Sequence, residues 1–271
     1  MNQITKDVVK AIAAVRNKTP LVHNITNYVT VNDCANAVLA IGASPIMADD
    51  ILEAADIAAI SSALVLNIGT LNQRTIASMV AAGKRANELG IPVVLDPVGA
   101  GASALRNDTV KMLLEQVRMS IIRGNISEVG FLAGLQVATK GVDAAEIDAG
   151  NDAAAVAKAV AACFHCVAAI TGAVDVISDG TRVVKIHNGH PMLSKVTGTG
   201  CMTTSLVGSF AGAADAFTAA VGGIASMGIA GELAYEKAGK LGTGSFHIAI
   251  IDALSMLDAD LMEKRAKLYE E

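Results

Sequence analysis

The stretch from residue 196 to residue 204, VTGTGCMTT, holds the side chains and glycines of this chain that are best suited to chemistry. Gly198 and Gly200 let backbone N–H groups approach a bulky anion, and the residues from Cys201 to Phe210 read as a helix. A glycine turn that opens a helix leaves several N–H groups unpaired, with the positive end of the helix dipole behind them. Phosphate is the usual occupant of such a turn.

Cys201 stands in the first turn of that expected helix, where a thiol ionises more easily than in a free cysteine. The same short segment therefore offers an anion cradle and a candidate base. In the alternative interpretation, the glycines only allow close packing in a helical layer, and Cys201 is a buried structural residue.

Two carboxylates and a cation follow neighbouring strand-like runs. Asp96 comes directly after residues 92–95, and Arg123 and Glu128 follow residues 120–122. Mg²⁺ takes one or two carboxylates together with substrate phosphates and waters, so Asp96 and Glu128 suit it. Arg123 suits a polyphosphate. The plainer alternatives are a turn cap for Asp96, a helix-dipole partner for Glu128 and a surface salt bridge for Arg123.

Composition narrows the class of protein. The chain has 271 residues, of which 52% are hydrophobic and 3% aromatic, so small aliphatic residues build the core. The net charge is −5 and no basic cluster occurs, which argues against a nucleic-acid partner. Residues 196–214 and the run from 216 to 231 are uncharged but rich in Gly, Ser and Thr, and we expect buried helices there rather than membrane spans.

Cysteine usage favours a reducing cytoplasm. The four cysteines are few and irregularly spaced, and Cys163 and Cys166 form a C-x-x-C half-site with no second pair to complete a zinc site. We expect these two to serve packing. Lys6, Asp7 and Lys10 interrupt the N-terminal stretch, so no signal peptide is expected.

Apolar strand-like runs alternate with helical ones, which predicts an α/β fold with a mostly parallel sheet flanked by helices. Asp179-Gly180 between two apolar runs predicts a hairpin at one edge, and only helices are expected after Cys201. Nothing marks a domain boundary, so residues 1–271 are expected to form one domain. The expected strands are 63–68, 92–95, 120–122, 167–170, 174–177 and 183–186, and the expected helices include 73–89, 111–117 and 153–163.

Polar or glycine residues follow four of these strands: Asn67 to Thr70, Asp96 to Gly101, Arg123 to Asn125, and Thr171 to Gly172. Ligands of a parallel sheet bind beyond the carboxyl ends of its strands. The four segments together therefore predict one site at this edge.

Several segments, in order from about residue 20 to 255, resemble motifs of hydroxyethylthiazole kinase, a family of the ribokinase-like fold. They are Asn24 to Asn27, Ala43 to Met47, Leu66 to Leu71, Leu95 to Ala100, Arg123 to Glu128, Thr197 to Cys201 and Gly242 to Phe246. The resemblance is specific, because relatives in that fold generally carry Asp at the position of Cys201. It implies transfer of the ATP γ-phosphate to the primary hydroxyl of 4-methyl-5-(2-hydroxyethyl)thiazole, a salvage step of thiamine biosynthesis.

The resemblance also implies roles for single residues. Met47, Asn24 and Gly198 would bind the thiazole substrate, whereas Arg123, Thr171 and Gly200 would bind ATP. Asp96 and Glu128 would organise Mg²⁺, Cys201 would sit beside the reacting hydroxyl, and residues 243–246 would lie near adenine. The family is a homotrimer with sites between subunits. Asp49-Asp50, directly after Met47, is more acidic than the resemblance leads us to expect.

Three other functions remain open on the sequence alone. One is a kinase of the same fold that acts on a hydroxymethylpyrimidine or a sugar. Another is a hydrolase with Cys201 as nucleophile, although none of the five histidines sits in a recognisable partner motif. The third is a protein that binds thiazole or nucleotide without catalysis.

Overall fold

One nine-stranded sheet runs through the computed structural model, which describes residues 2–140 and 152–271. Its strand order is β2-β1-β3-β4-β5-β6-β7-β8-β9, parallel from β2 to β6 and antiparallel from β6 to β9. The strands are β1 (Leu21–Ile25), β2 (Ser44–Ile46), β3 (Ala63–Asn67), β4 (Val93–Asp96), β5 (Ile121–Asn125), β6 (Val167–Thr171), β7 (Asp175–Ser178), β8 (Val183–Ile186) and β9 (Leu268–Glu270).

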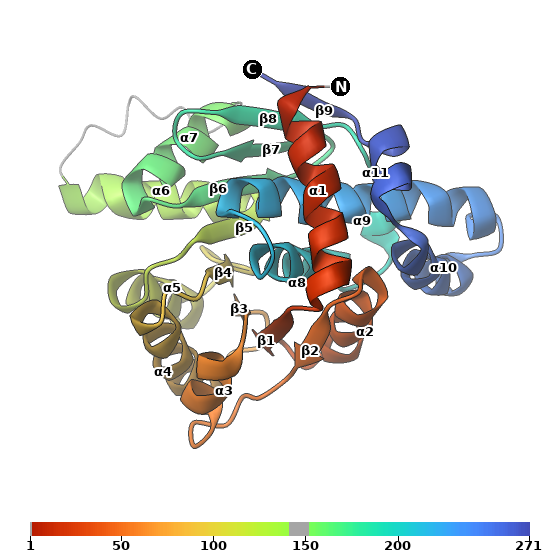
Figure 1. Cartoon of the computed structure of the whole chain (residues 1–271). Helices are drawn as coiled ribbons and strands as arrows, with labels where there is room; N and C mark the ends of the chain where they lie inside the picture. The colour runs from red at the N-terminus through yellow and green to blue at the C-terminus, as the bar shows by residue number, and fades with distance from the viewer. Residues whose placement is uncertain (1, 141–151) are drawn as a thin grey trace.

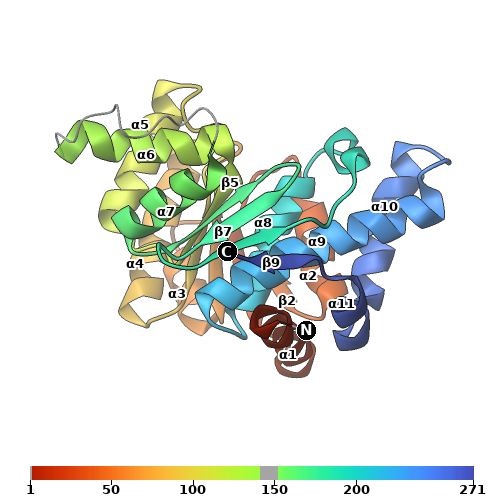
Figure 2. The same cartoon turned by 90° about the horizontal axis from the view of Figure 1, so that it is seen from above.

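Helices cover both faces of this sheet, and each face has its own hydrophobic cluster (Figures 1 and 2). One layer consists of α3 (Ala54–Ile60), α4 (Gln73–Glu88), α5 (Ala104–Gln116), α6 (Ile126–Lys140) and α7 (Ala153–Phe164). The other consists of α1 (Gln3–Lys18), α2 (Val31–Ile41), α8 (Thr199–Ala211), α9 (Ala216–Ala238), α10 (Thr243–Met256) and α11 (Ala259–Arg265), and the 3-10 helix η2 (Pro191–Lys195) precedes α8.

Burial on both faces explains the composition of the central strands. Every residue of β3 and β4 is buried, so these strands are continuous apolar runs up to their polar last residues, Asn67 and Asp96. Both residues therefore emerge at the carboxyl edge of the sheet, in register with each other.

The predicted alternation of strands and helices is confirmed from residue 63 onward. The hairpin at Asp179-Gly180 joins β7 to β8, and the helix expected from Cys201 begins two residues earlier, at Thr199. The expectation of helices alone after Cys201 is wrong at one point, because β9 pairs with β8 and extends the sheet. Hydrogen bonds from Asn2 Nδ2 to Leu268 O and from Ile4 N to Glu270 Oε1 hold β9 against the start of α1, beside the N-terminus (Figure 1).

The two uncharged runs form buried helices, as predicted. All but the first three residues of α8 are buried, and most of α9 is too. Of the described helices, α9 is the one with the length and composition to cross a membrane, but 83% of its most apolar window is buried inside the protein. Cys166 is also buried in the core, and this burial raises the pKa of its thiol to about 12, as for a packing residue.

Candidate active site

The N-terminus of α8 points its free N–H groups into the carboxyl edge of the sheet. Gly198 is the N-cap residue, with φ +88°, a conformation that L side chains rarely adopt. Among the described residues, no side chain caps the N–H groups of this first turn. The glycine turn therefore leaves the donors and the dipole of α8 available to an anion.

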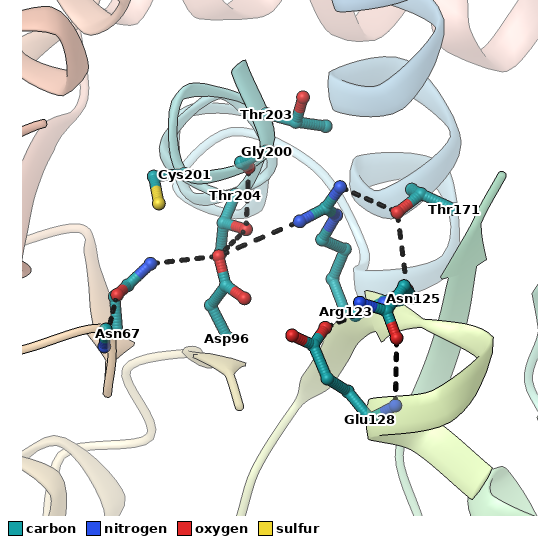
Figure 3. Close-up of polar contacts among 12 residues, drawn as sticks. Asn67, Asp96, Arg123, Asn125, Glu128, Thr171, Gly200, Cys201, Thr203 and Thr204 are labelled. Carbon is teal, nitrogen blue, oxygen red and sulfur yellow. Dashed lines mark hydrogen bonds and ion pairs between the residues drawn. The ribbon is translucent and has the colours of Figure 1, made fainter. Parts of the chain in front are cut away.

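Asp96, at the end of β4, faces α8 and is almost fully buried. Its Oδ2 accepts hydrogen bonds from Thr204 Oγ1 at 2.7 Å and from Asn67 Nδ2 at 3.0 Å, and lies 3.8 Å from Arg123 Nη1 (Figure 3). Its Oδ1 is buried and has no hydrogen-bond partner within the described part of the chain.

Burial raises the pKa of the Asp96 carboxyl to about 6, although the Arg123 guanidinium and the hydroxyl of Thr204 lower it. A buried carboxylate oxygen without a donor is suited to a cation that arrives with the substrate. This side chain therefore fits Mg²⁺.

Arg123 extends from β5 across the end of the sheet towards Thr171, the last residue of β6 (Figure 3). Its Nη2 donates to Thr171 Oγ1 at 2.6 Å, and Thr171 Oγ1 donates to Gly124 O at 3.3 Å. A Cβ at Gly200 would lie 3.1 Å from Arg123 Nη1, so the absence of a side chain there lets the guanidinium reach the first turn of α8. A fixed positive charge thus lies beside the free N–H groups.

Glu128 belongs to a capping box at the start of α6. Glu128 N donates to Asn125 Oδ1 at 3.0 Å, and Asn125 N donates to Glu128 Oε2 at 2.9 Å. Its other carboxylate oxygen accepts a hydrogen bond from Gly99 N at 2.8 Å. Glu128 therefore ties the loop after β4 to the end of β5, and each oxygen keeps a lone pair for a water of a bound ion.

Cys201 projects from the side of α8 nearer to Asn67 (Figure 3). The amide Nδ2 of Asn27 lies 3.2 Å from Cys201 Sγ and 3.1 Å from Asn67 Oδ1. In the part of the chain that the structure describes, no histidine nitrogen hydrogen-bonds to this sulfur, and His247 pairs with Asp33 instead. The geometry lacks the cysteine–histidine pair that a nucleophilic hydrolase needs.

Two cavities open at the carboxyl edge of the sheet. The Met47 pocket, of about 260 Å³, is lined by Asn24, Thr26, Tyr28, Val31, Met47, Asp49, Thr70, Asn72, Arg74 and Thr75. The Arg123 pocket, of about 570 Å³, is lined by residues of β5, α8 and α9, by the segment from Thr171 to Asp175 and by residues 188–191, 193 and 194, and it includes Gly200. Asn24 lines the first pocket and accepts a hydrogen bond from Ser205 of α8, whereas Thr199 and Thr203 of α8 line the second.

The acidic pair after Met47 has a structural partner. Arg74 of α4 donates to both carboxylate oxygens of Asp49, at 3.1 and 3.0 Å, and lies 3.8 Å from Asp50. Asp49 and Arg74 both line the Met47 pocket. Asp49 therefore forms part of the pocket wall with Arg74, and Asp50 lies near the same arginine.

Most of the residues singled out in the sequence come together here. Met47 and Asn24 line one pocket, Arg123, Thr171 and Gly200 line the other, and Cys201, Asp96 and Glu128 are held by the contacts above. Gly198 lines neither pocket; a Cβ there would lie 2.6 Å from Thr30 Cγ2. The side chain of Asn24 is buried, with Nδ2 donating to Val22 O. Residues 243–246 are likewise absent from the lining of the Arg123 pocket.

Sequence reasoning missed four residues that hold the site together. Asn27 and Asn67 link Cys201 to Asp96 through side-chain hydrogen bonds, and Thr204 donates to Asp96 from α8. Arg106 of α5 donates to the carbonyl oxygens of Ile68, Gly69 and Val98, and so fixes the loops after β3 and β4. Asn67 does lie in one of the polar segments that follow predicted strands, and Asn27 lies in a segment that resembles the family, but no spacing rule joins them.

Comparison with known proteins gives the family. The sequence model of the hydroxyethylthiazole kinase family matches residues 12–260. A hydroxyethylthiazole kinase of Ruminiclostridium cellulolyticum is 64% identical over 272 residues, covering 100% of both chains. The structure of a hydroxyethylthiazole kinase from Pyrococcus horikoshii OT3 superposes with a TM-score of 0.90 and 39% identity, covering 98% of this chain and 99% of that one.

More distant structures share the fold alone. A pyridoxal kinase from Staphylococcus aureus, in complex with AMP-PCP and pyridoxal, has a TM-score of 0.55 at 13% identity, covering 79% of this chain and 87% of its own. The α/β fold is therefore ribokinase-like, as expected from the sequence. From the full-length identity to named kinases and from the family match, the chain belongs to the hydroxyethylthiazole kinase family and is a phosphotransferase.

Proposed function

We propose that the protein transfers the γ-phosphoryl group of ATP to the primary hydroxyl of 4-methyl-5-(2-hydroxyethyl)thiazole, giving the thiazole phosphate for thiamine biosynthesis or salvage. The observation that carries this proposal is the start of α8, which lines the Arg123 pocket together with Arg123 and reaches the Met47 pocket through the Ser205–Asn24 hydrogen bond. The family match adds the identity of the alcohol.

The Met47 pocket takes the thiazole and the Arg123 pocket takes ATP. The soft side chain of Met47 suits a small, neutral, sulfur-containing ring. Asn24 shapes the floor of this pocket through Ser205, and Gly198 acts through the turn that it allows at the start of α8. Arg123, Thr171 and Gly200 hold the phosphates of ATP.

Mg²⁺ supplies charge neutralisation on the transferring and leaving phosphates when it is bound. Asp96 offers its free Oδ1, and Glu128 orients water in the ion's shell. Phosphoryl transfer has a loose transition state, so positioning and charge stabilisation dominate its catalysis. Arg123 and the N–H groups of α8 then offset the charge on the transferring group.

Cys201 accepts the proton of the substrate hydroxyl. The O–H bond breaks, an S–H bond forms on the thiolate, and the oxygen keeps the electron pair with which it bonds to the γ-phosphorus. The bond from that phosphorus to the leaving oxygen of ADP breaks in the same step. Because the hydroxyl proton can leave late in such a reaction, a cysteine, as its thiolate, can serve in this position.

We also propose that the kinase is a homotrimer with its sites between subunits and that it works in the cytoplasm. Tyr28, which lines the Met47 pocket, is 78% exposed, and Leu52, on the loop that follows Met47, is 89% exposed. Exposed apolar side chains of this kind fit an interface in which a second chain completes the pocket.

Mg²⁺-dependent release of ADP, measured with the thiazole alcohol, a hydroxymethylpyrimidine, a sugar and no acceptor, tests the reaction. We expect release that depends on both Mg²⁺ and the thiazole alcohol. Preference for the pyrimidine or the sugar would overturn the substrate assignment, and release without any acceptor would indicate a hydrolase. Tight binding of thiazole or ATP without release would leave only a binding protein.

A further inference from the structure

The side-chain amide of Asn27 lies between the candidate base and the buried carboxylate. Its Nδ2 lies 3.2 Å from Cys201 Sγ and 3.1 Å from Asn67 Oδ1. Asn67 Nδ2 in turn donates to Asp96 Oδ2 at 3.0 Å. Two amides therefore connect the sulfur of Cys201 to the carboxylate of Asp96.

The backbone N–H of Gly69 fixes the direction of the hydrogen bonds in the network that joins Asn67, Asn27 and Cys201. Gly69 N can only donate, and it lies 2.9 Å from Asn67 Oδ1, so that atom is the oxygen of the amide. Asn67 Oδ1 must therefore accept from Asn27 as well, which makes the atom of Asn27 that faces it the nitrogen. The same nitrogen faces the sulfur of Cys201, which consequently accepts.

The opposite end of the Asn27 amide is also fixed. Thr30 Oγ1 donates to Asn27 Oδ1 at 3.1 Å. Asn27 is 5% exposed, so its amide has little freedom to turn. Gly69 makes room for this arrangement, because a Cβ there would lie 2.9 Å from both Asn27 Nδ2 and Asn67 Oδ1.

We propose that Asn27 is a positioning residue for Cys201, whose amide N–H holds the sulfur as a hydrogen-bond acceptor in an orientation set by Asn67 and Asp96. This inference rests on the proposed function, in which Cys201 takes the hydroxyl proton. One N–H of Asn27 goes to Asn67 and the other to the sulfur. A donor aimed at the sulfur fixes the direction of one of its lone pairs and leaves the others for the substrate proton.

A double-mutant cycle on kcat, with Asn27→Ala and Cys201→Ala alone and combined, tests the proposal. In the native background we expect Asn27→Ala to lower kcat by about 10-fold or more, and by less than Cys201→Ala does, because general-base help is worth ~10²–10⁴-fold in all. The KM for the thiazole alcohol should change by less than about 3-fold, because positioning of the base acts on the transition state. In the Cys201→Ala background, Asn27→Ala should change kcat by no more than about 2-fold.

A carboxylate at position 201 should restore the coupling. In the Cys201→Asp background the new side chain can accept the same N–H, so Asn27→Ala should again lower kcat by about 10-fold. Asn27→Asp, which is isosteric and keeps an oxygen for Thr30, enters the same cycle if Asn27→Ala does not fold. Asn87→Ala is the matched control, because Asn87 also makes two hydrogen bonds, both to the Arg118 backbone. It should lower stability but leave kcat unchanged.

The outcomes separate the positioning role from the proposed function. An equal loss of kcat from Asn27→Ala with and without Cys201 would overturn the inference, and so would no loss in either background. A Cys201→Ala variant as fast as the native enzyme would remove both the proton acceptor and its positioning residue while leaving the kinase reaction in place. Absence of thiazole phosphorylation by the native enzyme would refute the function itself.

Discussion

At the scale of single residues, the two acidic side chains assigned to Mg²⁺ have different surroundings. Asp96 keeps one oxygen free of donors, whereas both oxygens of Glu128 accept backbone N–H groups. Asp96 is therefore the better direct ligand, and Glu128 carries a structural task besides any contact with the water shell of an ion.

Asp96→Asn and Glu128→Gln should both impair turnover more than thiazole binding, and to different extents. We expect Asp96→Asn to lower kcat by roughly 10²-fold or more, because it removes the charge that would neutralise the phosphates. Glu128→Gln should cost less in kcat and about 1 kcal/mol in the free energy of unfolding, since it weakens the capping box of α6. Calorimetry with the thiazole alcohol, ADP release and urea unfolding measure the three effects. Near-native turnover of Asp96→Asn at limiting Mg²⁺ would contradict its metal role.

The buried carboxyl of Asp96 also makes both kcat/KM and the stability of the protein depend on pH. Burial raises the pKa of Asp96 to about 6, so protonation below that pH removes the charge, and kcat/KM should fall on the acid side of about 6. The contribution of Asp96 to the free energy of unfolding depends on pH in the opposite sense. The folded protein binds this proton more tightly than the unfolded chain does, so the contribution of Asp96 to stability is present below about pH 4 and is lost as the pH rises through about 6.

Urea unfolding of the native protein and of Asp96→Asn between pH 4 and pH 8 measures this effect. The stability of Asp96→Asn relative to the native protein should increase across that range. Asp175→Asn is the control for activity, because burial also raises the pKa of Asp175 to about 6 while its Oδ1 serves the Gly172 backbone N–H. If the fall of kcat/KM on the acid side disappears in Asp175→Asn, the pH dependence comes from Asp175 and the assignment to Asp96 is wrong.

At the scale of elements, α8 does most of the positioning, because its first two turns line the Arg123 pocket and hydrogen-bond to Asn24 of the Met47 pocket and to Asp96 at the end of β4. Its two N-terminal glycines serve different ends. Gly198 adopts the positive φ of the turn, and Gly200 leaves space for the guanidinium of Arg123.

Substitution of each glycine by alanine should separate these tasks. Gly200→Ala should fold normally and lose about 10²-fold in kcat/KM for ATP, since its methyl group displaces Arg123. Gly198→Ala should lose about 1–2 kcal/mol of stability, because an L residue is strained at φ +88° and its Cβ meets Thr30. Gly130→Ala in α6 is the control, because its Cβ would meet nothing within 4 Å. Thermal unfolding measures the loss of stability, and ATP kinetics measure the loss of kcat/KM. Normal ATP use by Gly200→Ala would contradict the view that Arg123 must lie against this turn to hold the phosphates of ATP.

The sequence predicts those elements whose patterns are local. The strands from β3 to β8 contain short apolar runs that lie beside polar residues or a turn, and these runs identify them. In contrast, β9 has only three residues and exists because it pairs with β8. The site follows the same rule. The glycine turn and Asp96 are visible as motifs, whereas the contact of Asn27 with Cys201 spans 174 positions and depends on the packed fold.

At the scale of the whole molecule, large apolar side chains are exposed on two loops that contribute residues to the Met47 pocket. Leu52 lies on the loop after β2, which also carries Asp49, and Tyr28 lies on the loop after β1. Both loops lie at the carboxyl edge of the sheet, where the thiazole is proposed to bind.

Leu52→Asp should dissociate the proposed trimer and lower kcat/KM for the thiazole alcohol with little change in the unfolding of the single chain. The charge would be buried without a partner in the interface but would be solvated in the monomer. Sedimentation of native and Leu52→Asp protein, with kinetics on the same samples, measures both effects. A native protein that is monomeric and fully active would exclude shared sites between subunits.

The most direct test of phosphoryl transfer to the thiazole alcohol is the ³¹P spectrum of a reaction started with ATP, Mg²⁺ and 4-methyl-5-(2-hydroxyethyl)thiazole. The expected product is a phosphate monoester whose phosphorus couples to the two protons of the hydroxyethyl CH₂ group, formed in step with ADP. Inorganic phosphate as the sole product, or phosphate attached to the sulfur of Cys201, would contradict direct transfer between the two pockets.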